Sequence, residues 1–405
     1  MNQQSISFTQ KVKASPAEVY SAFTNATALR EWLSDVASAL PKPGGRLYLA
    51  WNSGYYASGE FTELQPGERA AFTWQGRGEP AQSRVQVRLS AQDGLTQVDL
   101  DHTGLGTGAG WEKASQEIEY GWKTGLENLA SVLETGEDLR FTLRPMLGIL
   151  VGVFDEEKAK ELGVPVSQGI RLDEAIDGMG AKAAGLRKDD VVVGMAGFTV
   201  TDFPSLTVAL QKQRGGDQVK VEFYRGGEKT SSMMQLSKRP VPEIPATAEA
   251  LAQAVQKKHA EIQAELDKTL AGVSEAQASF KPGPVDWSLK GVLAHLIQGE
   301  RGWHSFISDL INGQERVSDD YGDNVNAVIE ATVAAYSTLE ALRAEYRQNQ
   351  AETVQLLARL PEKFMARKGS YWRLAYYSLE DDTHNRLHTE QMAAALQAAR
   401  AAGVN

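Results

Sequence analysis

Residues 285–296 have the sequence VDWSLKGVLAHL, and this stretch marks the start of a helix in the C-terminal part of the chain. Ser288 offers a capping side chain directly before the apolar run, and Val292 and Leu296 then recur at helical spacing. His295 lies between those two positions on the same stripe. We therefore expect the His295 ring to point into the interior of a helical bundle.

Three further helices are expected around this one, because the same apolar spacing recurs on both sides of it. Their apolar positions are Leu251, Val255, Ile262 and Leu266; Val325, Val328, Ala335, Leu339, Leu342 and Tyr346; and Leu387, Met392, Ala395 and Leu396. Each helix has one apolar stripe to bury. An all-α four-helix bundle over residues 246–405 would bury all four stripes.

Two histidines lie on one face of the last helix. His384 and His388 are four residues apart, so their side chains leave the helix on the same side, one turn apart. Leu387 and Met392 indicate that this side faces inward. A buried imidazole is costly unless its nitrogen lone pair is used, and a divalent cation shared by His295, His384 and His388 would use all three.

Three neutral nitrogen ligands suit zinc, and nickel, cobalt, copper or ferrous iron would also bind them. Such a set leaves at least one coordination position for water or substrate, which is typical of a catalytic site rather than a structural one. Spacing alone also allows an alternative, because a single His-x-x-x-His pair is a weak signal. In that alternative the three are core histidines satisfied by hydrogen bonds.

Residues 246–401 resemble the DinB-like helical bundles, through the stretch 285–296 and through DTHNRLH at residues 382–388. The resemblance implies that the metal ligands are His295, His384 and His388. It also implies transfer or isomerisation with a low-molecular-weight thiol, as in some family members. The chain has no cysteine, so that sulfur would come from a cosubstrate. A hydrolase that uses metal-activated water would need the same open position.

Two breaks divide the chain into a multidomain α+β protein. Residues 133–138 end a helical pattern with a glycine and then charges, and residues 238–245 are too rich in proline to form a helix or a central strand. The predicted domains are 1–138, 139–240 and 246–405.

The N-terminal domain combines alternating strands with a helix at each end. Ser15-Pro16-Ala17-Glu18 places proline in the first turn of a helix. Strands of period two are expected at residues 46–51, 71–74 and 85–89. A long helix follows, with Ile118, Trp122, Leu126, Leu129 and Leu133 on its stripe. The parity that sends Val98 and Leu100 inward also sends His102 inward.

This order resembles the START-like SRPBCC superfamily, in its chaperone-ATPase-activator-homologue branch. The matching residues are Ser15-Pro16-Ala17-Glu18-Val19-Tyr20, Phe23-Thr24, Trp32, Gly44-Gly45, Phe72-Thr73-Trp74 and Gly121-Trp122. The resemblance implies a helix-grip fold and a pocket for an apolar small molecule, which would be lined by Trp51, Trp74, His102 and Trp122. The alternative is that these four side chains simply fill the core.

The middle segment resembles a PDZ domain of the bacterial HtrA type, a β-sandwich or barrel with helices. The signature is the alanine- and glycine-rich turn at residues 180–186, then Asp190-Val191-Val192 and Arg225-Gly226-Gly227. It implies that a C-terminal peptide adds as a strand, with contacts at Leu147, Gly148, Ile149, Leu150, Leu206 and Leu210. No serine protease motif accompanies the segment. The alternative is a rigid spacer.

The charge and hydropathy of the chain restrict its expected partners and location. A formal net charge of −10 with no long basic stripe argues against a nucleic-acid partner. No run is long enough to span a membrane and the N-terminus lacks the apolar core of a signal peptide, so we expect a cytoplasmic protein. Two hypotheses remain open: a ligand- and peptide-binding adaptor that carries a divalent-metal site, and a metal-dependent enzyme that uses a thiol or water.

Overall fold

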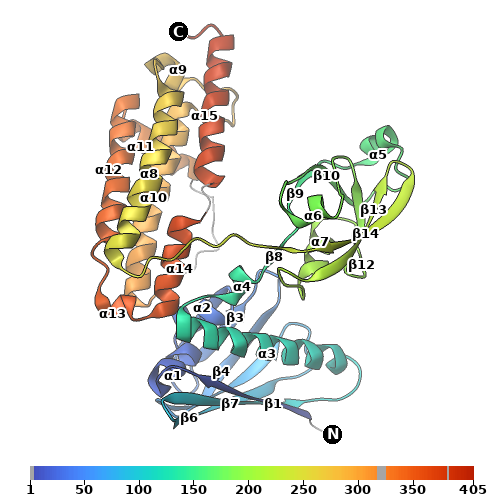
Figure 1. Cartoon of the computed structure of the whole chain (residues 1–405). Helices are drawn as coiled ribbons and strands as arrows, with labels where there is room; N and C mark the ends of the chain where they lie inside the picture. Colours follow the sequence, from blue (N-terminus) through green and yellow to red (C-terminus); the bar gives the residue numbers. More distant parts are fainter. Residues whose placement is uncertain (1–3, 317–324, 381–382) are drawn as a thin grey trace. The chain divides into compact units, whose positions relative to one another are not determined.

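The computed structural model describes residues 4–316, 325–380 and 383–405 (Figure 1). It divides into two compact units, of which one is formed by Met1–Asp138 together with Pro242–Asn405 and the other by Leu139–Val241. The predicted first and third domains thus belong to one unit. The predicted middle domain interrupts that unit in sequence.

The first unit begins with a seven-stranded antiparallel sheet and its helices. Their bounds are β1 (Gln4–Val12), α1 (Pro16–Thr24), α2 (Ala26–Trp32), β2 (Val36–Ala39), β3 (Arg46–Ala50), β4 (Tyr56–Gln65), β5 (Arg69–Gly76), β6 (Ser83–Gln92), β7 (Leu95–Leu105) and α3 (Trp111–Thr135). The strand order is β1-β7-β6-β5-β4-β3-β2. The long helix α3 buries Trp122, Leu126 and Leu129 in the same core as the inward side chains of the sheet.

Helix α3 ends at a glycine for two reasons. Gly136 has a φ of +88°, which only glycine adopts readily, and its N–H caps the helix by donating to the carbonyl of Val132. A Cβ at this position would also lie 2.6 Å from the carbonyl oxygen of Lys368. The glycine therefore permits a close approach between two segments of the unit that are far apart in sequence.

The second unit contains a six-stranded sheet and short helices. Its elements are α4 (Leu139–Thr142), β8 (Pro145–Met146), β9 (Ile149–Gly152), α5 (Glu156–Leu162), β10 (Ile170–Ala175), α6 (Gly180–Ala183), β11 (Val191–Met195), β12 (Phe198–Thr199), α7 (Phe203–Leu210), β13 (Gln218–Arg225), β14 (Glu228–Gln235) and β15 (Ser237–Lys238). The main path runs β14-β13-β11-β10-β9, and β12 pairs with β11. Strand β9 therefore forms one edge of this sheet.

The C-terminal part of the first unit is helical. Its elements are α8 (Ala248–Leu270), α9 (Glu275–Ser279), α10 (Leu289–Asn312), α11 (Val325–Ala335), α12 (Leu339–Leu357), α13 (Glu362–Met365), α14 (Lys368–Leu379) and α15 (Thr383–Ala401). Helices α8, α12, α10 and α15 contact one another in that cyclic order and form the bundle. No helix in the described part of the chain is both long and apolar enough to cross a membrane.

The third predicted helix is wrong in one respect. The apolar pattern from Val325 to Tyr346 is divided between α11 and α12. Thr338 begins the second piece, because its side chain accepts a hydrogen bond from the backbone N–H of Ala341. The apolar spacing continues across the interruption between α11 and α12, so the spacing alone did not reveal that the helix is divided there. Helix α14 was not predicted.

Charged side chains join the two parts of the first unit. Glu315, whose side chain is only 3% exposed, accepts two hydrogen bonds from Arg373 of α14, at 2.6 and 2.8 Å. Its carboxylate also lies 3.0 Å from Arg30 of α2. The backbone N–H of Glu315 donates to Thr27 of α2 at 3.1 Å. A single carboxylate thus offsets two guanidinium groups inside this unit.

Candidate metal centre

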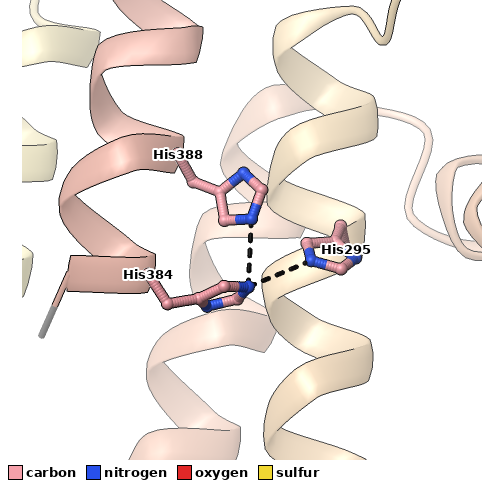
Figure 2. Close-up of side chains that lie close together, drawn as sticks. All are labelled: His295, His384 and His388. Atoms are coloured by element: carbon pink, nitrogen blue, oxygen red, sulfur yellow. Dashed lines mark hydrogen bonds between the residues drawn. The ribbon is translucent and has the colours of Figure 1, made fainter. Parts of the chain in front are cut away.

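Two helices of the bundle carry the histidine site. Ser288 caps α10 by accepting a hydrogen bond from the N–H of Gly291, and the helix then places His295 two turns from its start. Helix α15 supplies His384 and His388, one turn apart. Figure 2 shows that the three rings point into one common space from these two helices.

The distances match those expected of a metal site. Nε2 of His384 lies 3.4 Å from Nε2 of His295 and 3.1 Å from Nε2 of His388. One candidate ligand atom from each of the three residues can be chosen so that all lie within 4.8 Å of one another. Zinc–nitrogen bonds of about 2.0–2.1 Å in a tetrahedral site place nitrogen ligands about 3.3 Å apart. The three imidazoles therefore fit a divalent cation.

A neighbouring side chain sets the tautomer of one ring. Nδ1 of His388 lies 2.9 Å from Oε1 of Gln391, one helical turn further along α15. A carboxamide oxygen only accepts hydrogen bonds, so Nδ1 of His388 carries the proton. The lone pair of His388 is then on Nε2, the atom that faces His384. Metal-binding histidines are commonly oriented in this way by a second hydrogen bond.

The His295 ring is neutral in the folded protein. Partial burial, with added repulsion from His388 and His384, lowers the pKa of His295 to about 4. At neutral pH one of its two ring nitrogens therefore carries a free electron pair instead of a proton, which a metal ligand requires.

An aromatic side chain borders the triad. The ring of Trp287 lies with its centroid 5.0 Å from that of His295 and is stacked 6.5 Å from that of His388. Its indole N–H donates to Oδ1 of Asn326 at 3.0 Å, which fixes the orientation of the ring. Trp287 thus forms one wall of the site.

The site is more open than the sequence predicted. His384 is exposed, and His295 and His388 are only partly buried. Leu387, which was expected to face inward, is 56% exposed. The inward stripe of α15 consists of Met392, Ala395, Leu396 and Ala399. At about 100° per residue, Leu387 lies about 140° around the helix from Met392.

Three other residues were predicted to lie near the site. Asp381, suggested as an orienting group, lies outside the described residues. Asn385 accepts a hydrogen bond from the Tyr346 hydroxyl at 3.1 Å, and Glu390 is exposed. Gln391 and Trp287 were missed in these roles. The three-residue spacing from His388 to Gln391 was the available signal, because such pairs share a helix face.

The four residues predicted to line a pocket in the N-terminal domain lie close together. The ring of Trp74 has its centroid 6.4 Å from Trp51, 5.6 Å from Trp122 and 5.9 Å from His102. The indole N–H groups donate to Leu33 from Trp51, to Glu79 from Trp74 and to His102 from Trp122. These contacts agree with the core-packing alternative, and ligand binding at this place stays a prediction.

His102 has both ring nitrogens engaged within the protein. Nδ1 accepts the Trp122 N–H at 3.0 Å, so Nε2 carries the proton and donates to Oγ of Ser83 at 2.7 Å. The residue is fully buried, and burial lowers the pKa of His102 to about 4.

The predicted peptide contacts of the middle segment differ in their exposure. Leu147 and Leu206 are buried in the core, and Ile149 and Leu210 pack against it. Leu150 on the edge strand β9 is exposed. Gly148 has a φ of +75°, and a Cβ there would lie 2.2 Å from Cβ of Met179. Glycine is therefore required here by the local packing, whatever binds nearby.

Comparisons with known families match two parts of the chain. Residues 13–134 match the family described as activator of Hsp90 ATPase homolog 1-like protein. Residues 256–378 match the family described as mycothiol-S-transferase. The second match includes His295 and ends before His384 and His388, so their place in the site rests on the geometry.

Known proteins are similar over shorter stretches. A Lactococcus lactis protein described as serine protease Do-like HtrA is 30% identical over 116 residues, which are 27% of this chain and 28% of that protein. A probable periplasmic serine protease of the do/HhoA-like type from Haemophilus influenzae is 26% identical over 105 residues, 26% of this chain and 22% of that protein. This chain therefore matches less than a third of the length of either relative.

Among solved structures, the Aha1 dimer from Colwellia psychrerythraea is 21% identical, with a TM-score of 0.29, over 32% of this chain and 96% of that chain. Taken together, the family matches and the fold describe a mixed α+β protein. It carries an Aha1-like, SRPBCC-type sheet domain near its N-terminus. Its C-terminal region is a mycothiol-S-transferase-like, DinB-type helical domain with a histidine triad suited to a divalent metal.

Proposed function

We propose that the C-terminal helical domain is a divalent-metal-dependent S-transferase that acts with a low-molecular-weight thiol. The observation that carries this proposal is the convergence of three imidazoles, with Nε2 spacings of 3.1 and 3.4 Å, at a place where His384 is exposed. A structural metal would be enclosed by four protein ligands, whereas three ligands at an exposed place leave room for a substrate. The mycothiol-S-transferase match supports the same choice.

The residues of the chain have separate roles in this proposal. His295, His384 and His388 hold the cation, and Gln391 fixes the tautomer of His388. A divalent cation held there would lower the pKa of a thiol in its open position, so that the sulfur reacts as the thiolate.

The transfer itself forms a carbon–sulfur bond. The sulfur attacks an electrophilic carbon. Either that carbon expels its leaving group with the bonding electrons, or, in an activated double bond, the π electrons move to the neighbouring atom, which takes up a proton from solvent. The proton of the thiol passes to solvent, which reaches the exposed side of His384. The sulfur must come from a cosubstrate, since the chain has no cysteine.

Turnover of a fluorogenic electrophile tests the proposal. The full chain, loaded with zinc or stripped by a chelator, would be incubated with monochlorobimane and with mycothiol, cysteine or glutathione in turn. We expect conjugation with at least one thiol in the zinc-loaded protein, and its loss in the stripped protein and in His384→Ala. Conjugation at equal rates in all three proteins would refute the proposal.

Two controls separate the alternatives. Arg386→Ala changes an exposed residue of the same helix and should leave the rate unchanged. Hydrolysis of ester or amide probes without any thiol, lost in His384→Ala, would instead favour the alternative in which the site activates water.

A second function is proposed for the middle unit, where a C-terminal peptide would bind beside the edge strand β9. Leu150, Val151 and Val153 are exposed along and just after this strand, and Phe203 and Val208 are exposed on α7. An edge strand offers unpaired backbone groups to an extended peptide, and nearby apolar side chains would receive its side chains. In this proposal the chain also acts as an adaptor.

Fluorescence polarisation with a library of C-terminal peptides tests the adaptor proposal. Leu150→Glu should weaken binding at least about tenfold, because it places a charge in an apolar contact. Val285→Glu, at an exposed valine of the other unit, is the matched control. Equal binding by both variants would exclude β9 as the site. An apolar ligand of the N-terminal domain and a cytoplasmic location stay predictions from the sequence.

A further inference from the structure

A layer of polar side chains crosses the helical bundle between two apolar clusters. One cluster contains Leu266, Ile297 and Tyr346, and the other contains Val255, Ile307 and Leu357. Each of helices α8, α10 and α12 carries polar side chains between these positions that are buried or half-buried. They are His259, Gln263, Glu300, His304, Asn349, Gln350 and Thr353.

The titratable side chains of the layer are linked by hydrogen bonds and a longer ion-pair contact. The hydroxyl of Thr353 donates to Oε2 of Glu300 at 2.7 Å and lies 2.9 Å from Nε2 of His304. Oε1 of Glu300 lies 3.9 Å from Nε2 of His259. These contacts satisfy the Glu300 carboxylate inside the bundle, where an isolated charge would be costly.

The amide of Gln350 is the exception. The residue is 3% exposed, and its Oε1 accepts a hydrogen bond from Nε2 of Gln263 at 2.7 Å. Its own Nε2 is buried and has no hydrogen-bond partner among the described residues. Turning the amide over would leave its oxygen in that position instead. A buried polar atom left in this state costs about 1–3 kcal/mol, so a native structure usually provides it with a partner.

A hollow of about 220 Å³ lies next to this amide, between α8 and α12. Gln350, Gln263 and His259 line its inner side, and Ala260, Ala351 and Val354 provide apolar surface. The small alanine side chains leave the space between the two helices unfilled. Because α8 and α12 carry none of the three metal ligands, this hollow is separate from the histidine site.

We infer that this hollow is a second ligand site, which binds a small neutral molecule with amide or hydroxyl groups. The charges at its rim are already offset, because Arg347 contacts Asp267 at 2.7 Å. The groups that can still bind a ligand are the carboxamides of the lining glutamines. A carboxamide both donates and accepts hydrogen bonds without a net charge, so it suits a neutral ligand rather than an ion. The volume is below the roughly 300–1,000 Å³ of drug-sized pockets, so the ligand is small.

Titration of the isotope-labelled full chain with N-acetylglycinamide, followed by the side-chain amide resonances in NMR spectra, tests the inference. We expect saturable shifts at Gln350 and Gln263, with a dissociation constant of roughly 1–10 mM, which is usual for so small a molecule. Sodium acetate and butanol, as anionic and apolar probes, should give no saturable shift at these two residues. Stronger binding of acetate or butanol would overturn the neutral ligand class.

Two variants make the test specific. Gln350→Met removes the buried amide and should weaken N-acetylglycinamide binding at least about fivefold while zinc affinity at the triad stays unchanged. Ala351→Leu fills the hollow without touching the polar layer and should have the same effect, so it serves if Gln350→Met does not fold. Absence of any saturable shift in the unaltered chain, or full binding by Ala351→Leu, would overturn the inference.

Discussion

His102 and the histidine triad are two arrangements of the same side chain with opposite consequences. In the N-terminal domain, Trp122 and Ser83 occupy both nitrogens of a fully buried ring. In the bundle, the rings of His295, His384 and His388 turn their nitrogens toward one another, and at least one of them is exposed. The first arrangement has no nitrogen left for a ligand. The second brings ring nitrogens of three residues to one place, where a divalent cation would be bound.

The comparison teaches that an inward position does not decide what a histidine does. His102 and His295 were both expected to point inward because of the strand or helix on which they lie. The deciding feature is the partner of each nitrogen, which depends on contacts from other elements. Substitutions at the two kinds of histidine should therefore have opposite effects on stability and on metal binding.

His102→Ala should destabilise the protein by about 3 kcal/mol or more, because it opens a cavity and leaves the Trp122 N–H buried without a partner. Urea-induced unfolding measures the change. The affinity of the triad for zinc should stay the same. Tyr48→Ala, at an exposed position on β3, is the control and should change stability by no more than about 0.5 kcal/mol.

Acid should weaken the protein partly through His102. Its pKa is about 4 in the folded state, below the ordinary value of 6.5, so below about pH 6.5 the unfolded state binds the proton that the folded state does not. Stability is then lost as pH falls from 6.5 to 4, by at most about 1.4 kcal/mol per pH unit from this group. Unfolding of the unaltered chain and of His102→Gln at several pH values measures the difference. Identical pH slopes would contradict the assignment.

His384→Ala should weaken zinc binding at least about 100-fold, because it removes one of three ligands, whereas loss of an orienting residue alone costs about 10–100-fold. Competition with a chelating dye measures the affinity. The metal-free protein should keep its stability, since His384 is exposed. Arg386→Ala should bind zinc as the unaltered chain does.

Gln391→Leu should weaken zinc binding about tenfold, since Nδ1 of His388 would lose its hydrogen-bond acceptor and the ring its fixed tautomer. The same dye competition applies. Glu390→Leu, one residue away and also exposed, is the matched control. If the two variants bind zinc equally well, Gln391 has no orienting role.

Much of this architecture follows from local patterns. The four-residue spacing of His384 and His388 and the place of His295 on an apolar stripe predicted inward-pointing rings, since helix geometry sets the direction of each side chain. The resemblance to the DinB-like bundles was needed to favour a shared metal over core histidines satisfied by hydrogen bonds. The long helix of the N-terminal domain and its inward Trp122, Leu126 and Leu129 followed from the same periodicity.

Other features depend on partners distant in sequence. The exposure of His384 and Leu387 depends on how α15 is rotated against its neighbours, and one misleading apolar residue was enough to misjudge it. The polar layer of the bundle was not predicted as such: His259 was placed on the apolar stripe of its helix, but glutamine and glutamate on a helix normally indicate solvent. The break at Thr338 was signalled only by its capping side chain.

The interrupted order of the first unit has a consequence for biosynthesis. About a hundred residues, Leu139–Val241, are translated between the sheet domain and the helices that pack with it. At roughly 5–20 residues per second, the ribosome needs about 5–20 s to make them. The α2 surface that will meet α14 waits uncovered for at least that time, because α14 begins only at Lys368, and Arg30 and Glu31 lie on it. We expect the charged groups at this surface to reduce aggregation of the nascent chain until its partner emerges.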